Sequence, residues 1–225
     1  MASFSTSLAI DALTGESTVP ADPVAEQILD AALAQIQDFG LRRTSIDDVA
    51  RRAGLSRITI YRRFPNRDRL IESTFMRECR RFIRHLDAAV MPLRTTEERL
   101  VEGFVVAIRT ARAHPLISRL LASDPEVLLP FLTVRAGPAI AIARTYLAAR
   151  IRQVVAIAEV DAEQVAEVLV RLALSFVLVG ESCVALDNDR EIRVFARRHI
   201  VPMVTGATMS GRKTSIKPRS LRRHR

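Results

Sequence analysis

Residues 28–72 read ILDAALAQIQDFGLRRTSIDDVARRAGLSRITIYRRFPNRDRLIE. Apolar residues recur at helical spacing from position 24 to 38, which predicts a first helix that ends before Gly40, a residue suited to the left-handed conformation after a helix. Ser45 and the acid three positions later form a shorter relative of the capping box. This pattern predicts a second, short helix over about residues 46–53.

A third and a fourth helix follow directly. Ser56 is placed to cap a helix over about residues 57–64, and Asn66 to cap a long helix over about residues 67–91. The turn between the second and third helices contains Gly54, and the third helix is basic. Two short helices joined by a tight turn of this kind are typical of a helix-turn-helix.

The same stretch resembles the N-terminal domain of the tetracycline-repressor (TetR) family of bacterial regulators. The matching features lie at fixed offsets: Phe39-Gly40, Thr44-Ser45-Ile46, Asp48-Val49-Ala50, Ala53-Gly54-Leu55-Ser56, Ile60-Tyr61, Phe64 and Asn66-Arg67-Asp68 with Leu70. The family usually has Lys where Arg67 stands, and the charge is kept. The resemblance implies an all-α fold of about nine helices, with a three-helix DNA-binding domain followed by a helical ligand-binding and dimerisation domain.

The charge of the chain is unevenly distributed. The net charge is +9, yet residues 1–39 carry −6, residues 40–81 carry +7, residues 82–205 carry +1 and residues 206–225 carry +7. A basic block on a folded element is expected of a nucleic-acid binder. A solvated arginine-rich surface is the alternative interpretation of the charge alone.

The third helix offers the side chains that could enter a DNA groove. Arg57 or Arg62 could bind guanine through two hydrogen bonds, while Ile58 and the methyl group of Thr59 could touch a thymine methyl. The family resemblance implies phosphate contacts from Tyr61, Ser45 and Arg67, and helix N-termini favour anions. The predicted DNA-binding residues are Ser45, Ser56, Arg57, Ile58, Thr59, Tyr61, Arg62, Arg63 and Arg67.

The chain divides into four parts by pattern. We expect a disordered arm over 1–21, the helix-turn-helix domain over 22–68, a ligand-binding and dimerisation domain over 69–205, and a disordered basic tail over 206–225. Six helices are predicted in the larger domain: about 97–113 capped by Thr96, 116–123, 126–133, 137–157, 161–186 capped by Asp161, and 190–204 capped by Asp189.

The helix predicted over 161–186 is apolar on most sides, so we expect one of its faces to meet a partner chain. The resemblance implies a two-fold homodimer in which this helix and the last one pair with their copies. A single core helix in a monomer is the alternative. The candidate interface residues are Val165, Leu169, Leu172, Ala173, Phe176, Gly180, Ile192, Phe195 and Ile200.

The remaining helices are expected to frame a pocket for a small apolar or amphipathic effector. The candidate lining residues are Phe75, Phe82, Phe104, Ile108, Leu120, Phe131, Ile142, Tyr146 and Phe176, each of which could equally be plain core. His85 and His114 could add polar contacts, although a surface or hydrogen-bonded histidine is the alternative.

Nothing in the sequence indicates an enzyme. The known hydrolase, P-loop and zinc-peptidase motifs are missing, and Cys79 and Cys183 are too far apart in sequence for a disulfide framework or a Cys-based zinc site. We therefore expect no catalytic residue, metal or cofactor, and a cytoplasmic protein without membrane partners. The sequence favours a ligand-responsive repressor on a palindromic DNA operator; the alternative is a helical small-molecule-binding protein or enzyme with an idle DNA-binding module.

Overall fold

The computed structural model describes residues 22–134, 136–156, 159–179 and 181–210. These residues form helices and no strand, which confirms the all-α class. In chain order the helices are α2 (Pro23–Phe39), α3 (Ile46–Ala53), α4 (Arg57–Tyr61), α5 (Arg67–Val90), α6 (Thr96–Arg112), α7 (Pro115–Ser123), α8 (Pro125–Leu132), α9 (Gly137–Val154), α10 (Glu159–Leu178), α11 (Asp189–Phe195), the π-helix η1 (Ala196–Ile200) and α12 (Val201–Ser210). With the last three taken as one continuous rod, the described residues form ten helical segments, close to the nine expected.

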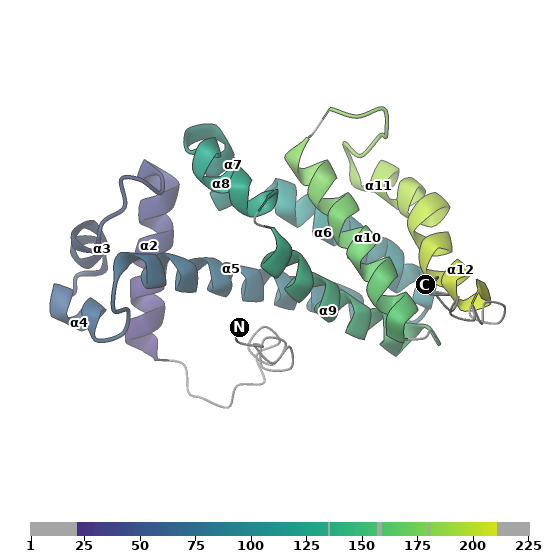
Figure 1. Ribbon diagram of the computed structural model, residues 1–225, viewed down its shortest axis with the longest axis horizontal. Coiled ribbons are helices and arrows are strands. Elements are labelled where there is room, and N and C mark those ends of the chain that lie inside the picture. The colour runs from purple at the N-terminus through teal and green to yellow at the C-terminus, as the bar shows by residue number, and fades with distance from the viewer. Residues whose placement is uncertain (1–21, 135, 157–158, 180, 211–225) are drawn as a thin grey trace, which may run out of the picture.

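Helices α2, α3 and α4 form a small unit at one end of the molecule (Figure 1). Their inward faces supply one hydrophobic core, in which Ile28, Val49 and Ile60 are fully buried. The start of α5 closes this core with Leu70. The helical spacing of apolar residues in the sequence therefore gives the correct inward faces in this region.

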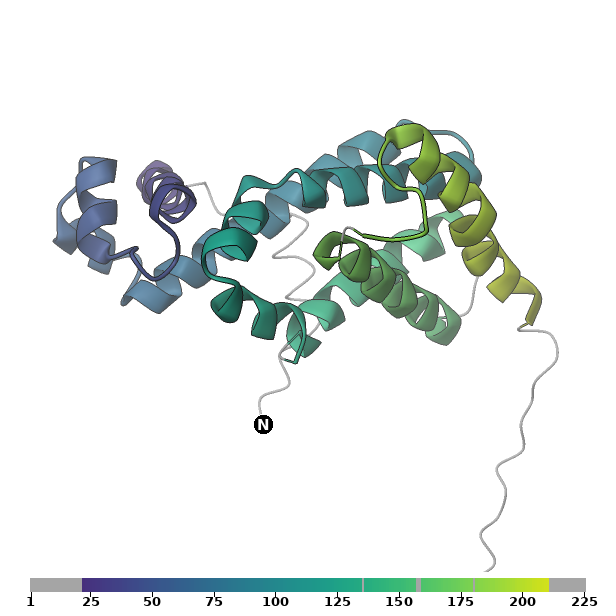
Figure 2. The ribbon, with the colours of Figure 1, turned by 90° about the horizontal axis from the view of Figure 1, so that it is seen from above.

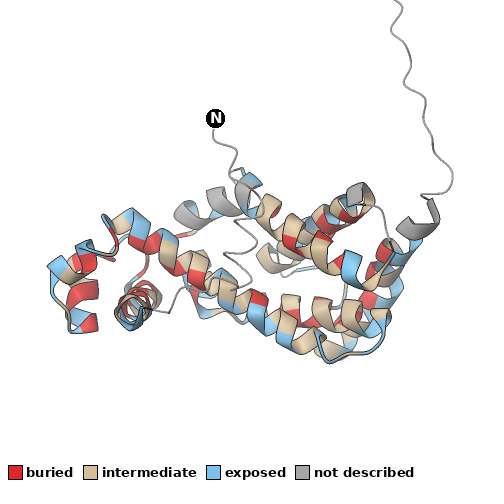
Figure 3. Cartoon of the chain, turned by 90° about the horizontal axis from the view of Figure 1, so that it is seen from below, coloured by how far each residue is buried: buried red, intermediate tan, exposed pale blue. Residues whose placement is uncertain are grey.

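Helix α5 connects the small unit to the larger one. Its 24 residues correspond to a length of about 36 Å, and Figure 1 shows it running from the small unit along the larger one. Helices α6, α9, α10, α11 and α12 surround a second core (Figure 2). Figure 3 shows the buried positions on the faces where these helices meet. No helix of the described residues is long and apolar enough to cross a membrane.

The predicted helix over 161–186 is wrong at both ends. Helix α10 begins at Glu159, so Asp161 lies inside it, and it ends at Leu178. The guanidinium of Arg112 on α6 donates to the carbonyl oxygen of Phe176, with N–O distances of 3.0 and 3.2 Å, and to that of Leu186 at 2.7 Å. A side chain distant in sequence thus satisfies the end of α10 and holds the following segment.

Two predicted caps are displaced by one residue. Thr95, rather than Thr96, caps α6 in a capping box with Glu98, and the hydroxyl of Thr96 donates to the carbonyl oxygen of Val154. Asn188, rather than Asp189, caps α11. In each case the neighbouring residue is a chemically equivalent cap, so the sequence pattern alone does not separate the two.

The last helix is longer than predicted and changes its winding. The chain continues from α11 through the π-helix Ala196–Ile200 into α12, which ends at Ser210, so residues 206–210 are helical and the expectation of a tail from 206 is wrong there. Pro202 lacks an N–H, so the usual bond to the carbonyl of Arg198 cannot form, which favours a locally wider turn. The predicted arm over 1–21 and the rest of the basic tail, 211–225, lie outside the described residues.

Candidate nucleic-acid interface

Helix α4 is fixed at both ends by local bonds. The Oγ of Ser56 accepts a hydrogen bond from the N–H of Thr59 at 3.1 Å, which confirms Ser56 as the cap. Gly54, with φ 64°, turns the chain between α3 and α4 in the left-handed conformation that glycine adopts freely. Ile60 is fully buried beneath α4 and Phe64 is 8% exposed, so these two residues anchor the helix to the core.

The outward face of α4 carries unpacked side chains. Ile58 is 73% exposed and Tyr61 is 50% exposed, although both are large and largely apolar. Arg62 is exposed, and its guanidinium has no hydrogen-bond or ion-pair partner within the described part of the chain. The structure thus exposes three predicted DNA-binding side chains close together, two on α4 and that of Arg62 directly after it.

Two further predicted DNA-binding arginines are paired with acids of the protein. Arg57 pairs with Asp47 at 2.6 Å, and Arg63 pairs with Asp22 at 2.6 Å. The hydrogen bond from Arg63 lowers the pKa of the Asp22 carboxyl. Asp22 lies 41 positions from Arg63 and Asp47 ten positions from Arg57, and neither acid is among the predicted DNA-binding residues.

Arg67 braces the loop that precedes α3. Its Nε donates to the carbonyl oxygen of Thr44 at 2.7 Å and its Nη2 to that of Leu41 at 2.5 Å. Both acceptors belong to the loop between α2 and α3, and the same guanidinium is 3.4 Å from Asp68. The side chain is only partly exposed, so any phosphate contact would share the guanidinium with these carbonyl groups.

Ser45 caps α3, as the sequence predicts. Its Oγ accepts from the N–H of Asp48 at 3.2 Å and donates to the carboxylate of Asp48 at 2.5 Å. This second bond is the main reason that the pKa of Asp48 is lowered. Gly40 ends α2 with a positive φ of 83° but an extended ψ of 169°, so it is not in the left-handed helical conformation that the sequence suggested.

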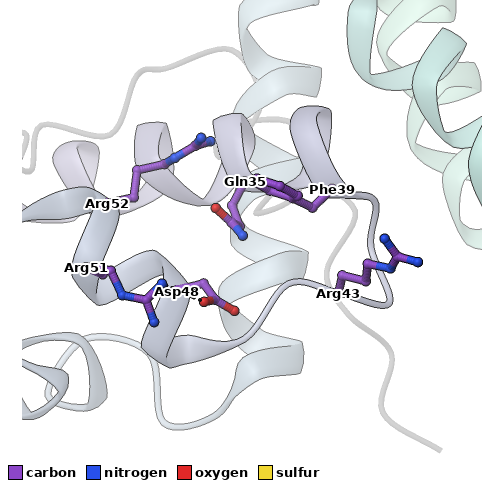
Figure 4. Close-up of a pocket in the computed structure, with 6 residues that line it drawn as sticks. All are labelled: Gln35, Phe39, Arg43, Asp48, Arg51 and Arg52. Carbon is purple, nitrogen blue, oxygen red and sulfur yellow. Dashed lines mark ion pairs between the residues drawn. The ribbon is translucent and has the colours of Figure 1, made fainter.

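A surface hollow of about 500 Å³ lies between α2 and α3, and Figure 4 shows its lining. Gln35 and Phe39 come from α2, Arg43 from the following loop, and Asp48, Arg51 and Arg52 from α3. Arg52 pairs with Asp38 and Arg51 with Asp48, so these charges are largely balanced. Arg51 and Arg52 belong to the basic block of residues 40–81, and neither is among the predicted DNA-binding residues.

The small unit also contacts the larger one away from α5. The backbone N–H of Leu41 donates to the carboxylate of Asp124, which is 6% exposed, at 3.1 Å. Arg119 donates to the carbonyl oxygen of Asp38 at 3.0 Å, and Arg42 pairs with Glu126 at 2.9 Å. We call this contact, made by residues 38–42 with residues 119–126, the loop junction. It joins residues about eighty positions apart, so no sequence pattern pointed to it.

A second set of charged contacts ties α2 to α5. Arg77 is 2% exposed, and its Nη1 lies 2.9 Å from Asp30 and 3.3 Å from Glu26. Its Nε lies 3.3 Å from Glu78, which in turn lies 3.6 Å from the Nε2 of His114. The orientation of α5 against α2 is therefore fixed by ion pairs as well as by apolar packing.

The predicted effector-lining residues fall into three separate apolar clusters. Phe75 and Leu120 lie with α2 and α7; Phe82, Ile142 and Tyr146 lie between α5 and α9; Phe104, Ile108 and Phe176 lie in the main core. The side chain of Phe131 is outside the described residues. The effector pocket stays a prediction, because these residues line neither the hollow in Figure 4 nor the neighbouring one at the loop junction.

The predicted dimer residues fall into buried and partly buried groups. Leu169, Ile192 and Ile200 are buried in the core of the chain itself. Five others are partly buried against that core: Val165, Leu172, Ala173, Phe176 and Phe195. Gly180 is outside the described residues. Val168 on α10, Val179 directly after α10 and Val194 on α11 are exposed apolar side chains, and none of the three is among the predicted interface residues.

His85 is exposed, and His114 lies near Glu78 with its Nδ1 buried and without a hydrogen-bond partner. Across the described residues, no three His, Cys, Asp or Glu side chains gather in a way that could hold a metal ion. The chemistry that the exposed groups of α4 offer is therefore hydrogen bonding by guanidinium, phenol and hydroxyl groups beside an apolar side chain.

Comparison with known proteins places this arrangement in a family. Residues 28–74 match the model of bacterial regulatory proteins of the tetR family, and residues 96–187 match the model of the C-terminal domain of the bacterial tetracycline repressor. The HTH-type transcriptional regulator AlkX of Mycobacterium tuberculosis is 32% identical over 181 residues, which cover 76% of this chain and 85% of that protein.

Two solved structures share the fold. The TetR family repressor AlkX from Dietzia sp. has a TM-score of 0.64 at 24% identity and covers 81% of this chain and 98% of its own. GusR from Salmonella enterica has a TM-score of 0.54 at 21% identity, with coverages of 85% and 98%. From its two matching domain models, its relative of similar length and its exposed helix-turn-helix, the chain belongs to the TetR family of bacterial transcriptional regulators.

Proposed function

We propose that this regulator is a repressor that binds a palindromic operator as a homodimer and leaves it when a small apolar or amphipathic effector binds. The observation that carries the proposal is the outward face of the capped and anchored helix α4, where Ile58 and Tyr61 are exposed, together with the exposed Arg62 directly after it. An α-helix fits the major groove of DNA, and side chains of these types contact bases and phosphates there.

The groups around α4 support the phosphate contacts that the sequence predicts. Ser45 lies at the N-terminus of α3 and Arg67 at that of α5, where free N–H groups and the helix dipole favour an anion. Ser56 and Thr59 share a short hydroxyl–hydroxyl contact of 2.9 Å at the N-terminus of α4. We assign these residues to holding the helix on the backbone, and the exposed face of α4 to reading bases.

The homodimer is proposed to form through the side of the molecule that carries α10 and α11. Val168, Val179 and Val194 are between 48% and 59% exposed there. The buried Leu169, Ile192 and Ile200 support these helices from within. A two-fold dimer would place two copies of α4 about 34–36 Å apart, the spacing of successive major grooves.

Two connections could carry an effector signal to α4. Helix α5 joins both units, and the loop junction fixes residues 38–42 to α7 and α8. An effector that binds among α5, α6 and α9 need only favour a conformation in which the two copies of α4 no longer match the groove spacing. A coupling free energy of about 1–3 kcal/mol is typical for such a change.

The DNA-binding part is tested by selecting duplexes from a randomised pool and measuring their affinity by gel shift. Arg62→Ala should weaken binding of the selected duplex by roughly tenfold, the effect of losing one good base contact. The matched control is Arg84→Ala, which removes one exposed arginine from α5, away from α4. Binding should also weaken steeply with salt. Equal effects of the two substitutions, or no bound duplex at low salt, would refute the proposal.

The effector part is tested on the same selected duplex. The Dietzia repressor of the same fold is described as implicated in biodegradation of n-alkanes, so a long-chain n-alkane and a long-chain fatty acid are suitable probes. Release of the duplex by either one, with a rise in the melting temperature of the protein, would support an apolar effector. A chain that binds such a probe but no duplex would instead be a helical small-molecule-binding protein.

A further inference from the structure

An acidic residue lies on the face that is proposed to meet DNA. Asp47, in the first turn of α3, has its Oδ1 2.6 Å from the Nε of Arg57, the first residue of α4. The contact therefore joins the two helices of the helix-turn-helix. The side chain of Asp47 is 44% exposed and that of Arg57 is 65% exposed. Both side chains are therefore accessible to solvent.

The guanidinium nitrogen of Arg57 that lies nearest Asp47 determines which N–H groups remain for a base. Nε is the guanidinium nitrogen closest to Asp47, and neither terminal nitrogen of Arg57 makes a hydrogen bond in the described part of the chain. Guanine presents O6 and N7 side by side in the major groove, and two N–H groups of one guanidinium match them. A guanidinium already held at Nε loses less rotational freedom when it binds, which raises discrimination between bases.

Without a role in positioning Arg57, the carboxylate of Asp47 would only weaken DNA binding. A carboxylate beside a DNA backbone is repelled by phosphate, so it lowers general affinity. The neighbouring Asp48 has a structural explanation, because it bonds to the cap Ser45 and pairs with Arg51. Asp47 makes no such capping contact, and Arg57 is the partner that the structure gives it.

We propose that Asp47 is a positioning residue for base reading: it holds Arg57 so that its terminal nitrogens face one base pair, at the expense of general DNA affinity. The inference rests on the proposed function, since it requires that α4 enters a groove. It assigns different roles to arginines that the sequence treats alike. Arg57 contacts a base while Asp47 positions it, whereas Arg63 is paired with Asp22 and contacts no base.

The experiment first locates the base pair that Arg57 reads. Duplexes are selected from a randomised pool with the wild-type protein and with Arg57→Ala, and the position at which the variant loses its preference is identified. Asp47→Ala should relax the preference at that same position by roughly fivefold or more. At the same time, it should bind unselected duplex more tightly than the wild type, because a negative charge is removed.

Three further variants separate positioning from charge. Asp68→Ala removes another exposed acid next to Arg67 without touching Arg57, so it should leave the preference unchanged. Asp47→Asn keeps an oxygen acceptor for Nε and should retain more of the preference than Asp47→Ala. The double variant Asp47→Ala, Arg57→Ala should lose no more preference than Arg57→Ala alone. If Asp47→Ala does not fold, Asp47→Ser takes its place, because its hydroxyl is too short to reach Arg57.

The outcomes are distinct. Failure of the wild type to select any sequence refutes the proposed function itself. If the wild type selects a site but Arg57→Ala relaxes no position, or Asp47→Ala keeps the preference at the Arg57 position, only the role of Asp47 is refuted. An equal relaxation in Asp68→Ala would also overturn it, because charge alone would then explain the effect.

Discussion

Single residues of the helix-turn-helix differ in how far their roles follow from sequence. Ser45, Ser56 and Asn66 are confirmed as caps, because a cap depends on residues only three positions apart. The partners of the arginines are not local: Asp22 lies 41 positions from Arg63. Sequence therefore predicts which residues the interface contains, whereas folding decides which of its guanidinium groups remain available.

A carboxylate in the larger unit offers a test of such a distant pair. Glu102 on α6 accepts two hydrogen bonds from Arg193 on α11, at 2.6 and 3.0 Å. These bonds lower the pKa of Glu102 from its ordinary value of 4.5. A carboxyl whose pKa is lower in the folded state stabilises the fold above pH 4.5, and this stabilisation is lost as the pH falls below that value.

We therefore predict that Glu102→Gln lowers the free energy of unfolding at neutral pH and makes it less dependent on pH below 4.5. Urea unfolding at a series of pH values, followed by circular dichroism, measures both effects. Glu97→Gln is the matched control, since the pair of Glu97 with Arg197 is more than half exposed at both ends. An identical pH profile for the two variants would contradict the prediction.

At the scale of helices, the α5–α9 contact combines apolar packing with a polar centre. The hydroxyl of Tyr146 donates to Asp87 at 2.5 Å, and Arg150 donates to the other carboxylate oxygen at 2.7 Å. Burial, together with the bond to Asp87, raises the pKa of Tyr146. The sequence placed Tyr146 among apolar lining candidates because its periodicity shows only that it faces inward. The acid it faces is 59 positions away.

Tyr146→Phe should lower the free energy of unfolding by about 1–2 kcal/mol, because it leaves one oxygen of a largely buried carboxylate without its donor. The chain has one other tyrosine, Tyr61, which is half exposed, so Tyr61→Phe is a matched control that should leave stability nearly unchanged. Urea unfolding measures the difference. Equal stability of the two variants would show that the bond to Asp87 contributes nothing.

The ends of helices show where sequence patterns fail. Helix α3 begins and ends as predicted because Ser45 and Gly54 are local signals. Apolar residues continue in the sequence after α10 ends at Leu178, so the pattern predicts a longer helix. Near its end at Leu178, Arg112 of another helix binds the carbonyl oxygen of Phe176, which the helix no longer satisfies itself. A signal of that kind exists only after the two helices have packed.

For the whole molecule, the arrangement of the two units depends on contacts that neither unit specifies alone. The long helix predicted over about 67–91 crosses the boundary between the two predicted domains, and α5 does connect the two units. The loop junction is a second connection, centred on the bond from the N–H of Leu41 to the buried carboxylate of Asp124. The predicted effector residues are scattered over three clusters for the same reason: inward-facing residues of different helices meet according to packing, which periodicity does not encode.

Asp124→Ala should loosen the loop junction. A hydrogen bond to a charged acceptor contributes about 1.5 kcal/mol or more, so the Leu41 amide should exchange its hydrogen roughly tenfold faster. Hydrogen exchange followed by mass spectrometry or NMR measures the rate. Asp124→Asn keeps an oxygen acceptor and should exchange more slowly than Asp124→Ala. Unchanged exchange in Asp124→Ala would show that this bond does not hold the loop.

The wide turn at Ala196–Ile200 has a consequence for the geometry of the final rod. Its buried residues Ile192, Ala196, Ile200 and Val204 recur every fourth position. In a regular α-helix such a series would drift around the axis by about 40° per interval. A turn that holds more residues takes up part of that drift, so one line of side chains stays in phase with the core. Pro202, whose missing N–H favours the wide turn, thereby contributes to the alignment of this line of side chains with the core.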